Sequence, residues 1–284
     1  MLLSGVYFAF PPIFADGERA QRPVVAKQPA ESGGPIEFQS LPEVPMTPSI
    51  AAHRRSIELL EESVRRLREI PGYTANFTKE EVVRGERTDP QTMRLKLRHA
   101  PYSIYLRWIE GKPGQELLFV KGKNDGKMIV RAGGLKGILG AIKLDVDGRM
   151  ARNNARHPVT EMGLLKLATS VLEYRYREAS WTSGYSCVET EELVDERPCH
   201  CFTLVYDSPK KSPDYRKSKL WIDKEYLVVT KICNYGWPEE EIAAKTIDER
   251  TKLEEYTYTN LNFHPSLVAT DFSAANDQYR LQRR

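Results

Sequence analysis

The stretch that decides the fold runs from Gln91 to Arg131 and reads QTMRLKLRHAPYSIYLRWIEGKPGQELLFVKGKNDGKMIVR. Apolar and charged residues alternate over its short runs, which places the apolar side chains of each run on one face of a β-strand. The apolar positions are Met93, Leu95, Leu97, Ile104, Leu106, Trp108, Met128 and Val130. The pattern predicts an antiparallel meander with one apolar face and one solvated face.

Similar runs extend the predicted sheet in both directions from this stretch. Asn124-Asp125-Gly126 is a strong turn signal between two of the strands. The expected strands cover residues 73–83, 91–98, 103–110, 115–121, 127–131, 184–192, 199–207, 218–223, 226–235 and 251–260. The sequence therefore predicts about ten strands.

Two segments have the spacing of amphipathic helices. The first runs from Pro48 to Glu69 and ends before Pro71-Gly72, where a helix cannot continue. The second is expected to start with Thr160 as its N-cap and to continue to about Arg177. Its apolar stripe consists of Leu164, Leu167, Ala168, Val171 and Leu172. Two main helices and an antiparallel sheet make an α+β domain.

The N-terminal part of the chain differs in composition from the rest. Residues 1–15 form a short apolar segment that ends in Ala15 and suits a secretory signal peptide, although the usual basic start is missing. An uncleaved membrane anchor and a buried N-terminal segment are the alternatives. Residues 16–48 are rich in Pro, Gly, Ser, Glu and Ala, which predicts a disordered linker. Residues 49–284 are expected to form a single domain.

Charge and motif content exclude several classes of function. The chain has 42 basic and 39 acidic residues, well mixed, which is an ordinary solvated surface and not that of a nucleic-acid-binding protein. The sequence motifs of serine hydrolases, zinc proteases, phosphate loops and dinucleotide sites are absent, and the five histidines are scattered. We therefore expect a protein without enzymatic activity and without a cofactor.

The four cysteines lie in the second half of the chain. Cys187, Cys199, Cys201 and Cys233 are disulfide candidates in an oxidising compartment, with buried free thiols as the alternative. Cys199-His200-Cys201 could suggest a metal site, but His200 would point to the opposite face of its strand from both thiols. No metal site is predicted.

A basic group precedes the second predicted helix. Arg149, Arg152, Arg156 and His157 could contact a phosphate or an acidic partner near the N-terminus of that helix. The alternative is a solvated loop in which Glu161 complements the helix dipole.

Six short segments, in this order, carry a resemblance to a known family. They are Gly72-Tyr73-Thr74-Ala75-Asn76-Phe77, Arg98-His99-Ala100-Pro101-Tyr102-Ser103-Ile104-Tyr105, Gly122-Lys123-Asn124-Asp125-Gly126-Lys127, Arg156-His157-Pro158-Val159-Thr160-Glu161-Met162-Gly163, Leu220-Trp221-Ile222-Asp223 and Asp271-Phe272-Ser273-Ala274-Ala275-Asn276. The first two segments look like the opening of the LolA/LolB-like lipoprotein-carrier superfamily. With the other four the chain resembles, more narrowly, domain of unknown function fifteen-seventy-one, an uncharacterised bacterial envelope family within that superfamily.

This resemblance implies a fold and a type of function. The fold would be a LolA-like half-barrel, a strongly curved antiparallel sheet of about ten strands wrapped around two main helices. Its concave side would hold a lipid or an acylated ligand in the periplasm, or at the inner membrane if the N-terminus stays uncleaved. Another envelope protein and the membrane surface would be further contacts. Two features depart from the carriers, namely the long segment 133–160 and the four cysteines.

The candidate cavity residues follow from the resemblance and the alternation together. They are Met93, Leu95, Leu97, Ile104, Leu106, Trp108, Met128, Val130, Leu220 and Ile222. Alternatively, the same residues pack against the two helices and leave no space for a ligand. The protein would then be an interaction or structural module that docks another envelope protein.

Overall fold

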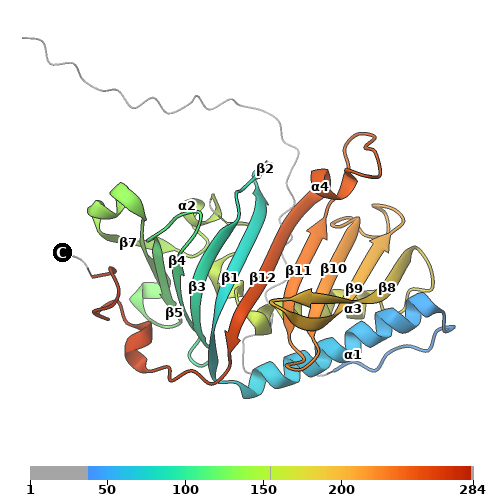
Figure 1. The fold of residues 1–284 in the computed structure, drawn as a ribbon, viewed down its shortest axis with the longest axis horizontal. Coiled ribbons are helices and arrows are strands. Elements are labelled where there is room, and N and C mark those ends of the chain that lie inside the picture. Colours follow the sequence, from blue (N-terminus) through green and yellow to red (C-terminus); the bar gives the residue numbers. More distant parts are fainter. Residues whose placement is uncertain (1–37, 154, 283–284) are drawn as a thin grey trace, which may run out of the picture.

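Twelve strands form one antiparallel sheet in the computed structural model, which describes residues 38–153 and 155–282 (Figure 1). The strands are β1 (Gly72–Val83), β2 (Glu86–Arg87), β3 (Gln91–Arg98), β4 (Ser103–Trp108), β5 (Glu116–Val120), β6 (Lys127–Arg131), β7 (Ala141–Asp145), β8 (Tyr185–Val194), β9 (Arg197–Tyr206), β10 (Lys217–Asp223), β11 (Val229–Tyr235) and β12 (Lys252–Asn262). The predicted α+β class with an open antiparallel sheet and two main helices is confirmed.

The sheet consists of two meanders that meet in its centre. Its order is β7-β6-β5-β4-β3-β1-β12-β11-β10-β9-β8, with β2 paired to the end of β1. Strands β1 and β12 join the halves, and Phe77 lies opposite Tyr258 in their register. The sequence did not predict β2, which has two residues, or the edge strand β7, in which Ile142 and Leu144 are too few to show a period.

The main helices are α1 (Pro48–Glu69) and α3 (Leu164–Glu178), and the short helices are α2 (Arg149–Arg152) and α4 (Ile247–Thr251). Helix α1 starts as predicted, with Pro48 at its first position and the Oγ1 atom of Thr47 accepting a hydrogen bond from the amide of Ile50 at 3.2 Å. None of the helices in the described part of the chain is long and apolar enough to cross a bilayer.

The expected N-cap of the second helix was wrong. Gly163 precedes α3, and Thr160 lies in a 3-10 turn, η3 (Val159–Glu161). Gly163 has a φ of 105°, and a Cβ atom there would lie 2.5 Å from Cδ1 of Leu97. The tight approach of the chain to the sheet, which only glycine permits, therefore sets the start of the helix.

The two main helices cover the concave face of the β8–β11 half. They pack against each other, α1 also packs against β8 and β9, and α3 against β11 (Figure 1). Leu220 and Ile222 of β10 are completely buried in this layer. The predicted apolar stripes of both helices face it.

The convex face of β4, β5 and β6 is covered by the C-terminal segment. Tyr105 of β4 stacks on Tyr279 with 3.8 Å between the ring centroids, and Phe272 and Leu281 complete a second apolar cluster. The prediction of a solvated outer face is therefore wrong in this part of the sheet. The outward-facing Tyr105 and Leu118 are apolar enough to bind the C-terminal segment.

The four cysteines are buried and are not joined by disulfides in this structure. Cys199, Cys201 and Cys233 lie on the outer face with Trp221, whereas Cys187 belongs to the main core. In the strand register, Cys201 lies opposite Trp221 and Cys233 opposite Lys219, so no two of these cysteines lie opposite each other.

The expected signal peptide, residues 1–15, lies outside the described residues, as does most of the expected linker. The end of that linker, residues 38–47, contains neither helix nor strand but contacts the domain. The amide of Gln39 donates a hydrogen bond to the hydroxyl of Tyr176, and Leu41 packs against the core.

Candidate functional site

A cavity of about 720 Å³ lies between the concave face of the sheet, α3 and the segment 146–163. This volume falls within the range of about 300–1,000 Å³ that is usual for small-molecule sites. Most of its lining is apolar. The apolar lining includes Phe77, Met93, Leu106, Trp108, Leu117, Met128, Val130, Leu144, Val146, Met162, Leu167, Val171 and Ile232. Such a lining suits a ligand with a large apolar part.

The structure divides the ten candidate cavity residues into two groups. Five line the cavity, namely Met93, Leu106, Trp108, Met128 and Val130. The other five are at most 1% exposed and belong to the packed core, namely Leu95, Leu97, Ile104, Leu220 and Ile222. The open cavity and the filled core, considered as alternatives from the sequence, are each present in a different part of the interior.

The cavity extends to the molecular surface. Met93 is fully buried, whereas Ile142, Met150 and Leu139, which also line the cavity, are 45%, 56% and 85% exposed. The apolar lining is thus continuous from the core to the solvent, and a ligand would enter past these exposed side chains.

The segment 146–163 forms one wall and is fixed to the sheet by tyrosines. The hydroxyl of Tyr102 donates hydrogen bonds to the carbonyl oxygens of Val159 (2.7 Å) and Met162 (3.0 Å). The amide of Leu164 donates to the hydroxyl of Tyr73 at 2.8 Å. Several residues of the long segment 133–160, among them Val146, Met150 and Val159, line the cavity.

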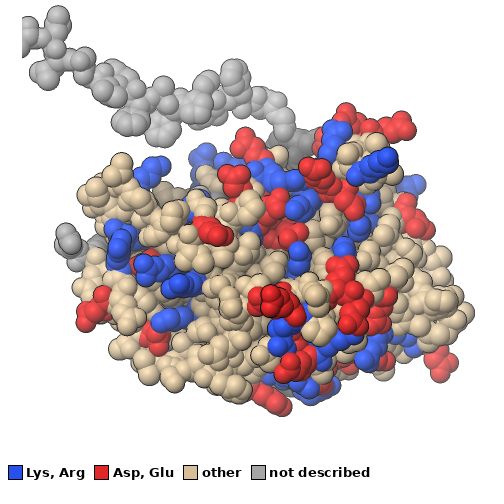
Figure 2. Space-filling model, viewed as in Figure 1, with Lys and Arg blue, Asp and Glu red and all other residues tan. Residues whose placement is uncertain are grey.

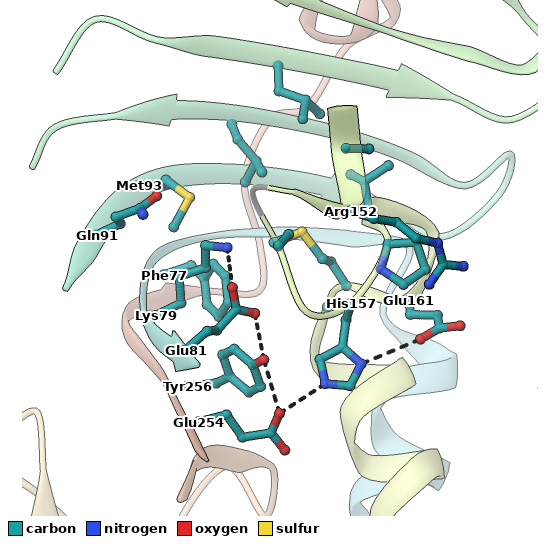
Figure 3. A pocket seen from close by; sticks show the side chains of 18 of the residues that line it. Phe77, Lys79, Glu81, Gln91, Met93, Arg152, His157, Glu161, Glu254 and Tyr256 are labelled. Atoms are coloured by element: carbon teal, nitrogen blue, oxygen red, sulfur yellow. Dashed lines mark hydrogen bonds and ion pairs between the residues drawn. The ribbon is translucent and has the colours of Figure 1, made fainter. Parts of the chain in front are cut away.

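A chain of charged residues lies at one end of the cavity (Figure 3). Lys79 and Glu81 pair on β1 at 2.6 Å, and Tyr256 of β12 donates a hydrogen bond to Glu81, also at 2.6 Å. Glu254 lies 3.0 Å from Nε2 of His157, whose Nδ1 atom lies 3.7 Å from Glu161. These contacts connect the wall to the central strands of the sheet.

Both members of the His157–Glu254 pair are held in their charged forms. Burial lowers the pKa of His157, but the carboxylate of Glu161 at 3.7 Å and the hydrogen bond to Glu254 outweigh this effect and raise the pKa to about 10. Burial raises the pKa of Glu254, yet His157 and Arg156, whose Nε atom is 2.9 Å away, lower it to about 2. His157 and Glu254 are therefore both charged at pH values near neutrality and form an ion pair.

The polar groups continue from Glu254 toward α3 across the half filled by the helices. Asn234 donates to Glu254 at 2.7 Å and accepts from Ser218 at 2.8 Å, and Ser218 lies 3.4 Å from Arg175. Arg175 in turn pairs with Glu178 at 3.0 Å. Buried polar groups with partners of this kind fix one arrangement of the core.

The four predicted anion contacts do not form one site. Arg156 and His157 bind Glu254, and Arg152 pairs with Asp147 at 3.0 Å. Arg149 is exposed on α2. Of the four, only Arg152 and His157 line the cavity. Among the described residues, no group of three or more His, Cys, Asp or Glu side chains could hold a metal ion.

Sequence reasoning missed Lys79, Glu81 and Glu254. The signal was present in β1, where the inward phase of Tyr73, Ala75 and Phe77 continues without interruption to Lys79 and Glu81. Charged residues in the buried phase of a strand indicate either a site or a buried ion-pair network.

A family model described as "Protein of unknown function (DUF1571)" matches residues 70–281. The chain belongs to this family. Membership confirms the narrow resemblance found in the sequence. The DUF1571 chain has no match among curated proteins.

Several solved structures are similar to the DUF1571 chain in fold. MucB, also solved as the Pseudomonas aeruginosa MucA/MucB complex, has 16% identity and a TM-score of 0.42, over 78% of this chain and 62% of MucB. The chain thus spans less than two thirds of MucB. The lipoprotein LppX of Mycobacterium tuberculosis has 11% identity and a TM-score of 0.42, over 76% and 98% of the two chains. A putative outer membrane lipoprotein-sorting protein domain from Vibrio parahaemolyticus has 13% identity and a TM-score of 0.35, over 78% and 97%.

Proposed function

We propose that this DUF1571 protein binds a lipid or another hydrophobic ligand in its cavity and acts as a carrier in the bacterial cell envelope. The observation that supports the proposal most directly is the apolar lining, which continues from the fully buried Met93 to the exposed Leu139. A packed structural core would leave no such space. A mostly apolar lining that also contains charged side chains, such as Lys79 and Glu254, is complementary to an amphiphilic molecule.

The energetics of such a ligand suit a carrier. Removing an acyl chain of about fifteen carbons from water contributes roughly 12 kcal/mol, at about 0.8 kcal/mol per CH₂. The chain gains a similar free energy in a bilayer. A cleft of comparable apolar quality can therefore accept a lipid and release it again without catalysis.

The charged residues of the cavity support a role without catalysis. A general acid or base works best with a pKa near the operating pH. The pKa of His157 is raised to about 10 and that of Glu254 is lowered to about 2, so neither exchanges protons near neutrality. Their contacts serve instead to fix the wall to the sheet.

The cellular location belongs to the same proposal. Residues 1–15 would direct export to the periplasm, either as a cleaved signal or as an anchor to the inner membrane. The linker would then give the domain reach across the envelope.

Native mass spectrometry of the protein purified from a bacterial periplasm tests the ligand directly. We expect a stoichiometric adduct of lipid mass, identified after solvent extraction. Val130→Trp, which places a large side chain in the cavity, should reduce the fraction of protein that carries ligand, whereas Val188→Trp on the exposed face of β8 should not. A clean protein mass that persists after incubation with envelope lipids would favour the alternative of an interaction module for another envelope protein.

A further inference from the structure

An apolar surface surrounds the entrance of the cavity. Three of its residues lie in the 3-10 segment η2 (Gly134–Leu139), and they are the most exposed large apolar side chains among the described residues. Leu135, Ile138 and Leu139 are 87%, 81% and 85% exposed. Ile142 of β7 and Met150 of α2 extend the surface. We call these five residues the lip.

The backbone of η2 is built so that these side chains point outward. Gly133 packs so closely that a Cβ atom would lie 2.4 Å from the carbonyl oxygen of Pro113 in the β4–β5 connection. At Gly137 a Cβ atom would lie 2.7 Å from the carbonyl oxygen of Ala132 and 2.9 Å from the guanidinium group of Arg131. The glycines hold the segment against the domain, and the large side chains between them are displayed to solvent.

The chain segment that carries the lip has an excess of positive charge. Residues 121–152 contain eight basic and three acidic residues, a net charge of +5, whereas the complete chain has a net charge of +3. Each of the three acidic residues pairs with a basic residue of the same segment: Asp125 with Lys143, Asp145 with Lys127 and Asp147 with Arg152. In Figure 2 the corner beyond β7 at the upper left is a tan surface, free of charged side chains on this face, with blue side chains beside it.

From this arrangement we propose that the lip docks the protein on the surface of an anionic bilayer. Exposed leucine and isoleucine side chains enter the boundary between headgroups and acyl chains, and lysine and arginine beside them bind anionic headgroups. Leu139, Ile142 and Met150 belong both to the lip and to the cavity lining. Docking would therefore place the entrance against the membrane, so that a lipid could pass between them without crossing water.

Hydrogen–deuterium exchange of the full chain, with and without vesicles, tests this proposal locally. With vesicles of phosphatidylglycerol and phosphatidylcholine we expect slower exchange in peptides that cover residues 132–150, and a much smaller effect with phosphatidylcholine alone. The readout is restricted to these peptides, so the apolar residues 1–15 cannot produce it.

Two variants and one control make the test specific. The triple variant Leu135→Ser, Ile138→Ser, Leu139→Ser should reduce the vesicle-induced protection of residues 132–150 about tenfold or more, because each side chain loses apolar burial in the bilayer. Lys136→Glu with Arg149→Glu should abolish the preference for anionic vesicles. Val188→Ser with Leu193→Ser removes apolar residues that are 55% and 69% exposed on β8 and should change nothing.

Three outcomes would overturn the proposal. They are unchanged exchange at the lip with every vesicle, equal binding by the triple variant, and protection that depends on protein concentration without vesicles, which would assign the lip to a contact between two copies. Failure of docking is distinguishable from failure of ligand binding, because native mass spectrometry measures the ligand occupancy of the cavity in the absence of vesicles.

Discussion

Glu81 of β1 and Glu254 of β12 lie directly opposite each other in the strand register, and both line the cavity. Two like charges at opposed positions destabilise a sheet. Lys79 pairs with the first carboxylate, and Arg156 and His157 pair with the second. The wall segment therefore supplies the positive charges that pair with Glu254, and its position against the sheet stabilises this opposed pair of carboxylates.

Replacing His157 by Gln should destabilise the protein in a pH-dependent manner. The pKa of His157 is about 10 in the folded chain and ordinarily 6.5, so its contribution is complete below pH 6.5 and is lost as the pH rises through 10. We expect a loss of about 2 kcal/mol at pH 6 and little difference above pH 10. Urea unfolding of both proteins across this range measures the effect. His264→Gln, at an exposed position, is the control and should be neutral.

Gly163→Ala should be far more harmful than Gly85→Ala. Both glycines have positive φ, 105° and 82°, but a Cβ atom at Gly163 would meet Leu97 at 2.5 Å, whereas nothing lies within 4 Å of one at Gly85. Backbone strain alone costs about 1 kcal/mol, and overpacking adds about 1–3 kcal/mol. Comparing the thermal unfolding of the two variants separates the cost of backbone strain from the cost of overpacking. Equal effects of the two substitutions would contradict the close approach of the chain before α3.

The cavity also predicts a contrast between two larger side chains. Val130→Trp places its added volume in the cavity and should leave the unfolding free energy within about 1 kcal/mol of the parent. Ile104→Trp in the packed core should cost about 3 kcal/mol or more. Chemical denaturation of the two variants measures the difference. A large loss of stability in the Val130 variant would mean that the space is closed in solution.

The cysteines should behave as four buried thiols. Burial raises the pKa of Cys187 and Cys233 to about 12, so their reactive thiolate form is scarce. Iodoacetamide should modify none of the four in the native protein and all four after denaturation without reductant. Recovery of disulfide-linked peptides from the protein would contradict the expectation of four free thiols.

The sequence was sufficient to predict most of the architecture, because alternation identifies strands and their buried face. It could not show which of the candidate cavity residues line the cavity and which belong to the packed core. Leu95 and Leu106 lie opposite each other on β3 and β4 and share the inward phase, yet only Leu106 lines the cavity. The difference depends on how far the helices and the wall reach across the sheet, which is a matter of tertiary packing and not of local period.

Two other errors arise from contacts between distant parts of the chain. Thr160 is a good N-cap residue by type, but the contacts of Gly163 with Leu97 and Tyr73 set the start of α3. Tyr105 was assigned to a solvated face, although its ring is covered by Tyr279, which lies 174 positions later in the chain. Contacts over such distances leave no periodic signal near either residue.

The pairing of β1 with β12 has a consequence for folding. Phe77 and Tyr258 face each other across 181 sequence positions, so the central contact of the sheet is also one of the most distant along the chain. Contacts of such high sequence separation form slowly, and a ribosome-bound chain that has not yet released β12 carries β1 with an unpaired edge. The cavity thus comes into existence only after β12 has been synthesised.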